Sequence, residues 1–125
     1  MNFDKVVAGF FIIFAMTLNF GFFYGDISDI KLHSEYELFA AIIINIIATV
    51  LKLGDRTQMG SVLLATSLVA IIQLVAAASI WAIAGYNVEI PKETTAIIVS
   101  LSGGALLANI TSVILYIGET VKSKR

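Results

Sequence analysis

The 125-residue chain contains no cysteine, a single histidine and a single proline, and only 14% of its residues are charged. Without cysteine, the chain has no disulfide, no thiolate-bound metal and no thiol nucleophile. One histidine excludes a metal site built from several imidazoles, and no nucleophile–base pair is apparent. A net charge of −1 argues against nucleic acid as a partner. We therefore expect no enzyme, no metal and no cofactor.

Apolar residues, in contrast, are abundant. They make up 58% of the sequence, with a mean hydropathy of +0.93, whereas a soluble domain has about 45–50% apolar and about 25% charged residues. Charged residues divide the chain into apolar blocks, and a helix that crosses a bilayer needs about 20 such residues. The sequence thus predicts an all-α fold, a four-helix transmembrane bundle in a single domain of residues 1–125. The predicted spans are residues 6–25, 35–53, 57–85 and 93–118.

The second predicted span has capping signals at both ends. Ser34 and Glu37 form the S-x-x-E pattern of a capping box, which favours a helix start at Glu35. At the other end, Gly54 suits the left-handed residue that follows a helix, and Asp55 suits the N-cap of the next helix. The second and third spans are therefore predicted to form a tight antiparallel hairpin. Its cytoplasmic tip is predicted to comprise Lys52, Gly54, Asp55 and Arg56.

Lysine and arginine are distributed unevenly between the two sides of this topology. With four spans, the N-terminal segment, the hairpin tip and the C-terminal tail share one side and carry all but two of the eight basic residues. The other two connections carry one each, Lys31 and Lys92. Because basic residues are enriched on the cytoplasmic side of membrane proteins, both termini are predicted to be cytoplasmic.

The ends of the second and fourth spans are similar in sequence. At an offset of 64 residues, Asn45 matches Asn109, and Gly54 matches Gly118, with an acidic residue after each glycine. This offset is close to half of the chain, as the duplication of a two-helix hairpin would give. Two interpretations remain open. The bundle consists of two tandem duplicated hairpins, or the similarity is a chance match between two apolar helices.

The polar groups inside the predicted spans are uncharged. Four of them are amides: Asn19, Asn45, Gln73 and Asn109. Asn45 and Asn109 lie equally far from the matched glycines, which predicts one layer about 13–14 Å from the cytoplasmic helix ends. Hydrogen bonding between packed helices is one interpretation of the amides, and a polar pathway or ion site is the other. Proton-coupled transporters usually need a charged group inside the membrane, and no charged residue lies well inside a predicted span.

Small residues follow one face of the fourth predicted span. Gly104, Ala108 and Ser112 form a small-xxx-small stripe, which favours close helix packing. The Gly103-Gly104 pair is also compatible with a break in this helix, of the kind that exposes backbone in transporters. The first span is rich in phenylalanine, which favours contact with lipid or with a partner helix.

Three stretches of the chain carry a family resemblance: Tyr36–Ala40, Asn45–Gln58 and Leu63–Ala70. They resemble a family of small, uncharacterised bacterial inner-membrane proteins, and the resemblance covers most of the chain. That family has no assigned activity, so the resemblance implies a multi-pass protein of the bacterial inner membrane and no mechanism. Two characterised families of similar size fit less well. Small multidrug-resistance transporters have a glutamate inside the first helix, and fluoride channels have a phenylalanine-rich motif in the third, where residues 57–85 contain none.

Two classes of function remain. The first is a non-enzymatic accessory or assembly subunit, either a homo-oligomer or bound to a larger membrane protein. The second is a small channel or transporter with a polar pathway lined by the amides. The uncharged interior and the packing stripe favour the first class. The lipid bilayer is the expected partner in both.

Overall fold

The computed structural model describes residues 3–26, 28–53, 58–85 and 89–123. Across these ranges the regular structure is helical and contains no strand. The elements are α1 (Phe3–Phe23), the short 3-10 helix η1 (Ile30–Leu32), α2 (Glu35–Lys52), α3 (Gln58–Ala84) and α4 (Lys92–Ser123). The prediction of an all-α fold with four long helices is thereby confirmed.

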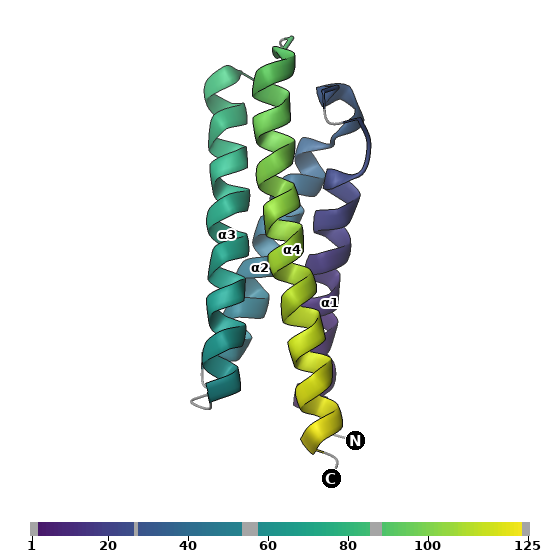
Figure 1. Cartoon of the computed structure of the whole chain (residues 1–125), viewed down its shortest axis with the longest axis vertical. Helices are drawn as coiled ribbons and strands as arrows, with labels where there is room; N and C mark the ends of the chain where they lie inside the picture. Colours follow the sequence, from purple (N-terminus) through teal and green to yellow (C-terminus); the bar gives the residue numbers. More distant parts are fainter. Residues whose placement is uncertain (1–2, 27, 54–57, 86–88, 124–125) are drawn as a thin grey trace.

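The four helices run antiparallel in chain order, and both chain termini lie at the same end of the bundle (Figure 1). We call this the terminal end. The opposite end, called the loop end, holds η1 and the connection between α3 and α4. Each helix packs against its neighbours in the chain, and α4 also packs against α1. The bundle therefore closes as a ring of four helices around a shared interior.

Three of the four helices are long and apolar enough to cross a membrane. They are Phe3–Phe23, Met59–Ala84 and Lys92–Lys122. The second helix falls outside this group because its 18 residues include three charges, Glu35, Glu37 and Lys52. The prediction of four spans is thus confirmed for three helices only, and the difference rests on charges at the two ends of α2.

The start of α2 follows the predicted cap, with one change in the role of Glu37. The Glu37 backbone N–H donates to Ser34 Oγ at 3.3 Å, as an N-cap requires. The Glu37 carboxylate, however, lies against Gly21 of α1, where a Cβ atom would collide with it. Glycine at this position therefore brings α1 and α2 close together at the loop end.

The fourth helix extends beyond its predicted span and is continuous through its glycine pair. It continues to Ser123, so Gly118 lies inside the helix and does not end it. It is also unbroken at Gly103 and Gly104. A Cβ at Gly103 would come within 2.8 Å of the Phe23 ring, and one at Gly104 within 2.8 Å of the Gln73 amide. The glycine pair therefore does not break the helix, and these glycines serve packing within the chain.

The pattern of buried positions repeats between α2 and α4. At the offset of 64, the buried residues Ala41, Asn45 and Ala48 match the buried residues Ala105, Asn109 and Ser112. The same offset relates the buried face of α3 to the exposed phenylalanine face of α1. The internal similarity therefore extends to the environment of the second and fourth helices and not to the first and third.

Candidate functional site

The interior of the bundle contains a polar region in its terminal half. Asn45 and Asn109, two of the predicted amides, are 1% and 3% exposed and face the shared interior. Asn45 donates from Nδ2 to the backbone carbonyl of Ala41 at 2.7 Å, and the backbone carbonyl of Asn45 accepts from the Thr49 hydroxyl at 2.8 Å. The amide nitrogen of Asn45 is therefore bonded within its own helix, one turn earlier in the chain.

Lys52 belongs to this region and does not extend into solvent. It is the last residue of α2 and only 7% exposed. Its Nζ donates to Ser67 Oγ at 2.5 Å, and Ser67 is itself 3% exposed. Ser67 lies nine residues into α3, about 13 Å along the helix. Lys52, predicted at the tip of the hairpin between the second and third spans, thus lies at the end of α2 with its side chain directed back to Ser67. Gly54, Asp55 and Arg56 lie outside the described residues.

The neighbouring residue on α3 links the polar region to α4. Thr66 and Ser112 share a hydrogen bond between their hydroxyl oxygens at 2.5 Å. Thr66 also donates toward the Leu63 carbonyl, with an oxygen–oxygen distance of 2.9 Å. Two adjacent residues, Thr66 and Ser67, thus hold α4 on one side and α2 on the other. The predicted small-residue stripe of α4 reaches α3 through this contact and through Gly104.

Several buried polar atoms of the described chain have no hydrogen-bond partner. Asn19 is fully buried, and neither of its amide atoms is bonded. The others are Gln73 Oε1, Thr95 Oγ1 and Asn109 Nδ2. Each such group costs about 1–3 kcal/mol when it is left unsatisfied. All four predicted amides thus face protein, and in three of them at least one atom has the capacity to bind water or another polar group.

Sequence reasoning missed two further buried hydroxyls on α4. Thr95 and Ser102 are both 0% exposed. They precede Asn109 at intervals of seven residues, which places all three on one face of the helix. This heptad spacing of polar residues is a signal that the sequence does contain.

Large apolar side chains form a cluster in the interior of the loop half. Phe22, Leu38, Leu74 and Ile98 come from four different helices and are at most 1% exposed. Trp81 packs in the same cluster, with its ring centroid 6.0 Å from that of Phe22. A second, smaller cluster of Ile12, Ala48 and Val113 lies beside the polar region. This apolar cluster shares the interior of the loop half with buried polar side chains, Asn19 of α1 and Thr95 and Ser102 of α4.

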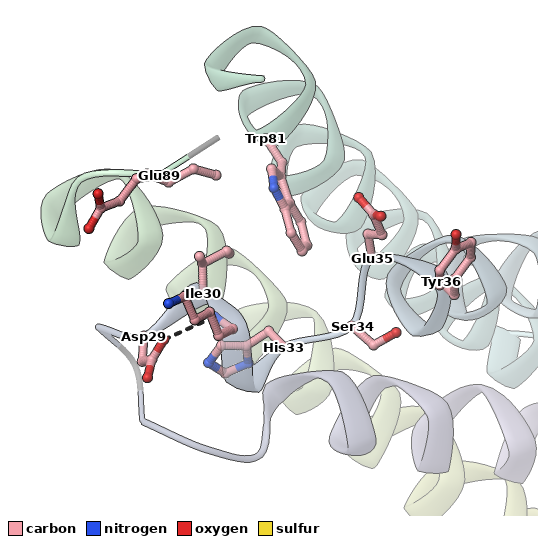
Figure 2. A pocket seen from close by; sticks show the side chains of 10 residues that line it. Asp29, Ile30, His33, Ser34, Glu35, Tyr36, Trp81 and Glu89 are labelled. Atoms are coloured by element: carbon pink, nitrogen blue, oxygen red, sulfur yellow. Dashed lines mark hydrogen bonds between the residues drawn. The ribbon is translucent and has the colours of Figure 1, made fainter. Parts of the chain in front are cut away.

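A cavity of about 690 Å³ opens at the loop end. Figure 2 shows Trp81 of α3 pointing toward the segment that carries Ile30 and His33, with Glu35 beside it. Carboxylates of Asp29, Glu35 and Glu89 contribute to the lining. No group of three or more potential metal ligands comes together in the described part of the chain. The cavity is consequently an open, partly acidic recess with one aromatic wall.

Hydrogen bonds within the segment order the connection from α1 to η1. The Ser28 backbone N–H and hydroxyl both donate to Asp26 Oδ1, at 2.9 and 2.8 Å. These bonds, the backbone one foremost, hold the pKa of the Asp26 carboxyl below its usual value. Asp29 Oδ1 accepts from the Lys31 N–H at 3.0 Å and caps η1. The segment therefore has a defined conformation despite its polar composition.

A smaller cavity of about 200 Å³ opens at the terminal end. Its lining includes Lys52, Lys5 and Glu119. Tyr116, which also lines it, donates its hydroxyl to the Lys5 carbonyl at 2.7 Å and so fixes α1 against α4. The buried side chain of Lys52 therefore borders a cavity that opens at the helix ends.

Comparison with known proteins gives a family and no function. No curated protein and no solved structure matches the chain. A family model matches residues 32–120, which include His33, α2, α3 and most of α4. The prediction of an uncharacterised family is confirmed by this match. Because the match covers more than half of the sequence, the chain belongs to DUF6394, a family of unknown function.

Proposed function

We propose that this protein is a non-enzymatic accessory or assembly subunit of the bacterial inner membrane, with four membrane-crossing helices and cytoplasmic termini. Three helices are compatible with a membrane by length and composition. Support for the fourth comes from its place in the ring, between α1 and α3. Its charges lie in its first turn and at its last residue, so residues 38–51 form an uncharged centre. Termini at the same end also require an even number of crossings.

The apolar cluster in the loop half carries the functional part of the proposal. Phe22, Leu38 and Leu74 pack together in the interior, where a conducting pathway through one chain would have to pass, and the buried polar groups of this half, such as Asn19, are separate side chains on different helices. The outer faces of the helices are apolar, with exposed fractions of 58% for Phe10 and 66% for Ile72. Such a molecule acts by contact within the bilayer, with another copy or with a larger membrane protein.

Topology is tested first, because the functional proposal depends on it. Reporter fusions after Arg125 and within residues 29–33 are expected to give opposite signals, cytoplasmic for the C-terminus. The asymmetry of basic residues motivates this orientation. A periplasmic C-terminus, or the same side for both fusions, contradicts it.

A flux assay then separates the two classes of function. The purified protein in liposomes is expected to pass neither protons nor small ions above the background of empty vesicles. Asn45→Leu and Asn109→Leu are expected to alter assembly or stability without altering flux. Thr111→Leu, an exposed polar position on α4, is the matched control. Native mass measurement in mild detergent then identifies the partner, and a co-purifying larger membrane protein supports the accessory role.

A channel or transporter is the second candidate, and one observation favours it. The amides of Asn19 and Asn109 have unpartnered atoms in the interior, and Lys52 places a cation there. Polar groups of this kind inside a membrane bundle line ion or substrate pathways in other proteins. A selective flux that disappears in Asn45→Leu and Asn109→Leu but persists in Thr111→Leu would establish this candidate and exclude the accessory role.

A further inference from the structure

The only histidine of the chain is buried at the loop end, and both of its ring nitrogens are bonded. His33 is 4% exposed. Its Nδ1 lies 2.6 Å from the carbonyl oxygen of Phe22, near the end of α1. Its Nε2 lies 2.8 Å from the carbonyl oxygen of Asp26, in the connection that follows. The ring thus joins two points of the chain that are eleven and seven residues earlier in sequence.

The identity of the two partners determines the protonation state that fits this site. A backbone carbonyl accepts hydrogen bonds and never donates them. A neutral imidazole carries one N–H, so one of its nitrogens would present a lone pair to a carbonyl oxygen. Only the imidazolium, which donates from both nitrogens, makes both observed contacts favourable. The geometry at Phe22 and Asp26 is therefore that of a charged His33.

Shape and charge around the ring agree with this state. Gly25 adopts a φ of 122°, and a Cβ there would crowd Leu32 and approach the His33 ring, so glycine allows the chain to fold over the histidine. The ring centroid lies 5.5 Å from that of Phe22. The Asp26 carboxylate lies close enough to interact electrostatically with both His33 and Lys92 of α4.

Other ionisable groups share the cavity with His33. Asp29 and Lys31 come from η1 and its cap, Glu35 from α2 and Glu89 from the segment before α4. From α1 and α3, the described neighbours are the aromatic side chains Phe22 and Trp81.

We propose that His33 is a proton-dependent latch, which in its doubly protonated form ties the connection of residues 24–34 to the end of α1 and shapes the loop-end cavity. Imidazole is the side chain whose charge ordinarily changes between about pH 5 and 8. Because the closed geometry binds the protonated form, the latch is closed at the acidic end of this range. As pH rises and the proton leaves, one carbonyl contact becomes repulsive and the connection loosens from α1. The direction is therefore closure in acid and release in base.

The composition of the chain makes the test simple, because it has one histidine and one tryptophan. With ¹⁵N-labelled histidine, the ring nitrogens of the full-length protein in detergent are expected to report an imidazolium at about pH 6 and a neutral ring at about pH 9. Over the same interval, amide hydrogen exchange in residues 24–34, corrected for its intrinsic pH dependence, is expected to accelerate by at least about tenfold. Trp81 fluorescence, which reports on the adjacent cluster, is expected to change together with it.

Variants separate the latch from other titrations. His33→Gln keeps a donor without a charge, so its exchange and fluorescence are expected to lack the pH step. Lys31→Gln, at an exposed position in the same segment, and Asp26→Asn, which keeps the backbone carbonyl, are expected to retain it. A neutral ring at about pH 6 in the folded protein overturns the proposal. So does a pH step that persists in His33→Gln, or a ring titration without any change in exchange. The ring measurement uses the unaltered chain, so it decides even if His33→Gln fails to fold.

Discussion

The two halves of the bundle are held together by different means. In the loop half, large apolar side chains such as Phe22 and Leu74 form the main cluster, and the buried amide of Asn19 in the same half has no hydrogen-bond partner. In the terminal half, the apolar cluster is limited to Ile12, Ala48 and Val113, and hydroxyl and ammonium groups connect the helices. The loop half is stabilised mainly by the packing of apolar side chains, and the terminal half mainly by a few hydrogen bonds between helices.

In the membrane location that we propose, this difference matters because the bilayer removes the usual advantage of apolar burial. Lipid chains are as apolar as leucine, so helices associate through van der Waals packing and hydrogen bonds and not through exclusion of water. Loss of volume in the loop half leaves a gap that neither lipid nor side chains refill completely. Loss of a bond in the terminal half costs only that bond and the exposure of its partner. The two halves should therefore respond differently to substitution.

The largest effect is expected where volume is removed from the loop half. Leu74→Ala, at a position with no exposed surface, is expected to lower the free energy of unfolding by about 2–3 kcal/mol, the lower end of the range for buried leucine. The value is low because the apolar environment persists in the unfolded state. Reversible unfolding in mixed detergent micelles measures it. Ile72→Ala, 66% exposed on the same helix, is the control, and equal losses in the two variants would contradict volume packing.

A smaller loss is expected from the polar contact in the terminal half. Ser67→Ala removes the hydroxyl that accepts from Lys52 Nζ and is expected to cost about 1 kcal/mol of stability. Ser79→Ala, at an exposed position of α3, should cost nearly nothing. In a double-mutant cycle with Lys52→Met, the combined loss should be smaller than the two single losses added. Strict additivity would show that the contact contributes nothing to stability.

The smallest effect, and one of opposite sign, is expected at Asn19. Its amide is buried without a partner, so Asn19→Leu is expected to leave stability unchanged or raise it by up to about 1 kcal/mol. Asn45→Leu removes a bonded amide and is expected to lower stability by about 0.6 kcal/mol. The same unfolding measurement compares the pair. A marked loss from Asn19→Leu would mean that its amide binds water or a polar ligand in the bilayer.

The helices could be predicted from the sequence because their signals are local. A run of apolar residues bounded by charges is read along the chain, and the cap at Ser34 is a four-residue pattern that the structure reproduces. The predicted fourth span ends at residue 118 because the charged Glu119 ends the apolar run, whereas α4 continues to Ser123. A charged residue ends an apolar run and is compatible with a continuing helix.

The interior contacts could not be predicted because they depend on how the helices pack. From the sequence, a lysine at a helix end is expected to lie at the surface. The side chain of Lys52 can bond to Ser67 only when α3 packs beside α2, which the sequence does not show. The partners of His33 are two backbone carbonyls, which every residue possesses and which leave no mark on the sequence. The burial of the three asparagines could be inferred from the sequence, whereas which of them would find hydrogen-bond partners could not.

The adjacent pair Thr66 and Ser67 has a consequence for the rotation of α3. This helix is apolar around most of its circumference, so packing alone gives it little preference for one azimuth over another. Thr66 points to Ser112 of α4 while Ser67 points to Lys52 of α2. A turn of the helix about its axis, or a slip by one residue, would break both contacts at once. The hydroxyls of two consecutive residues thus select one rotation of α3 about its axis, which the apolar surface of the helix alone would not determine.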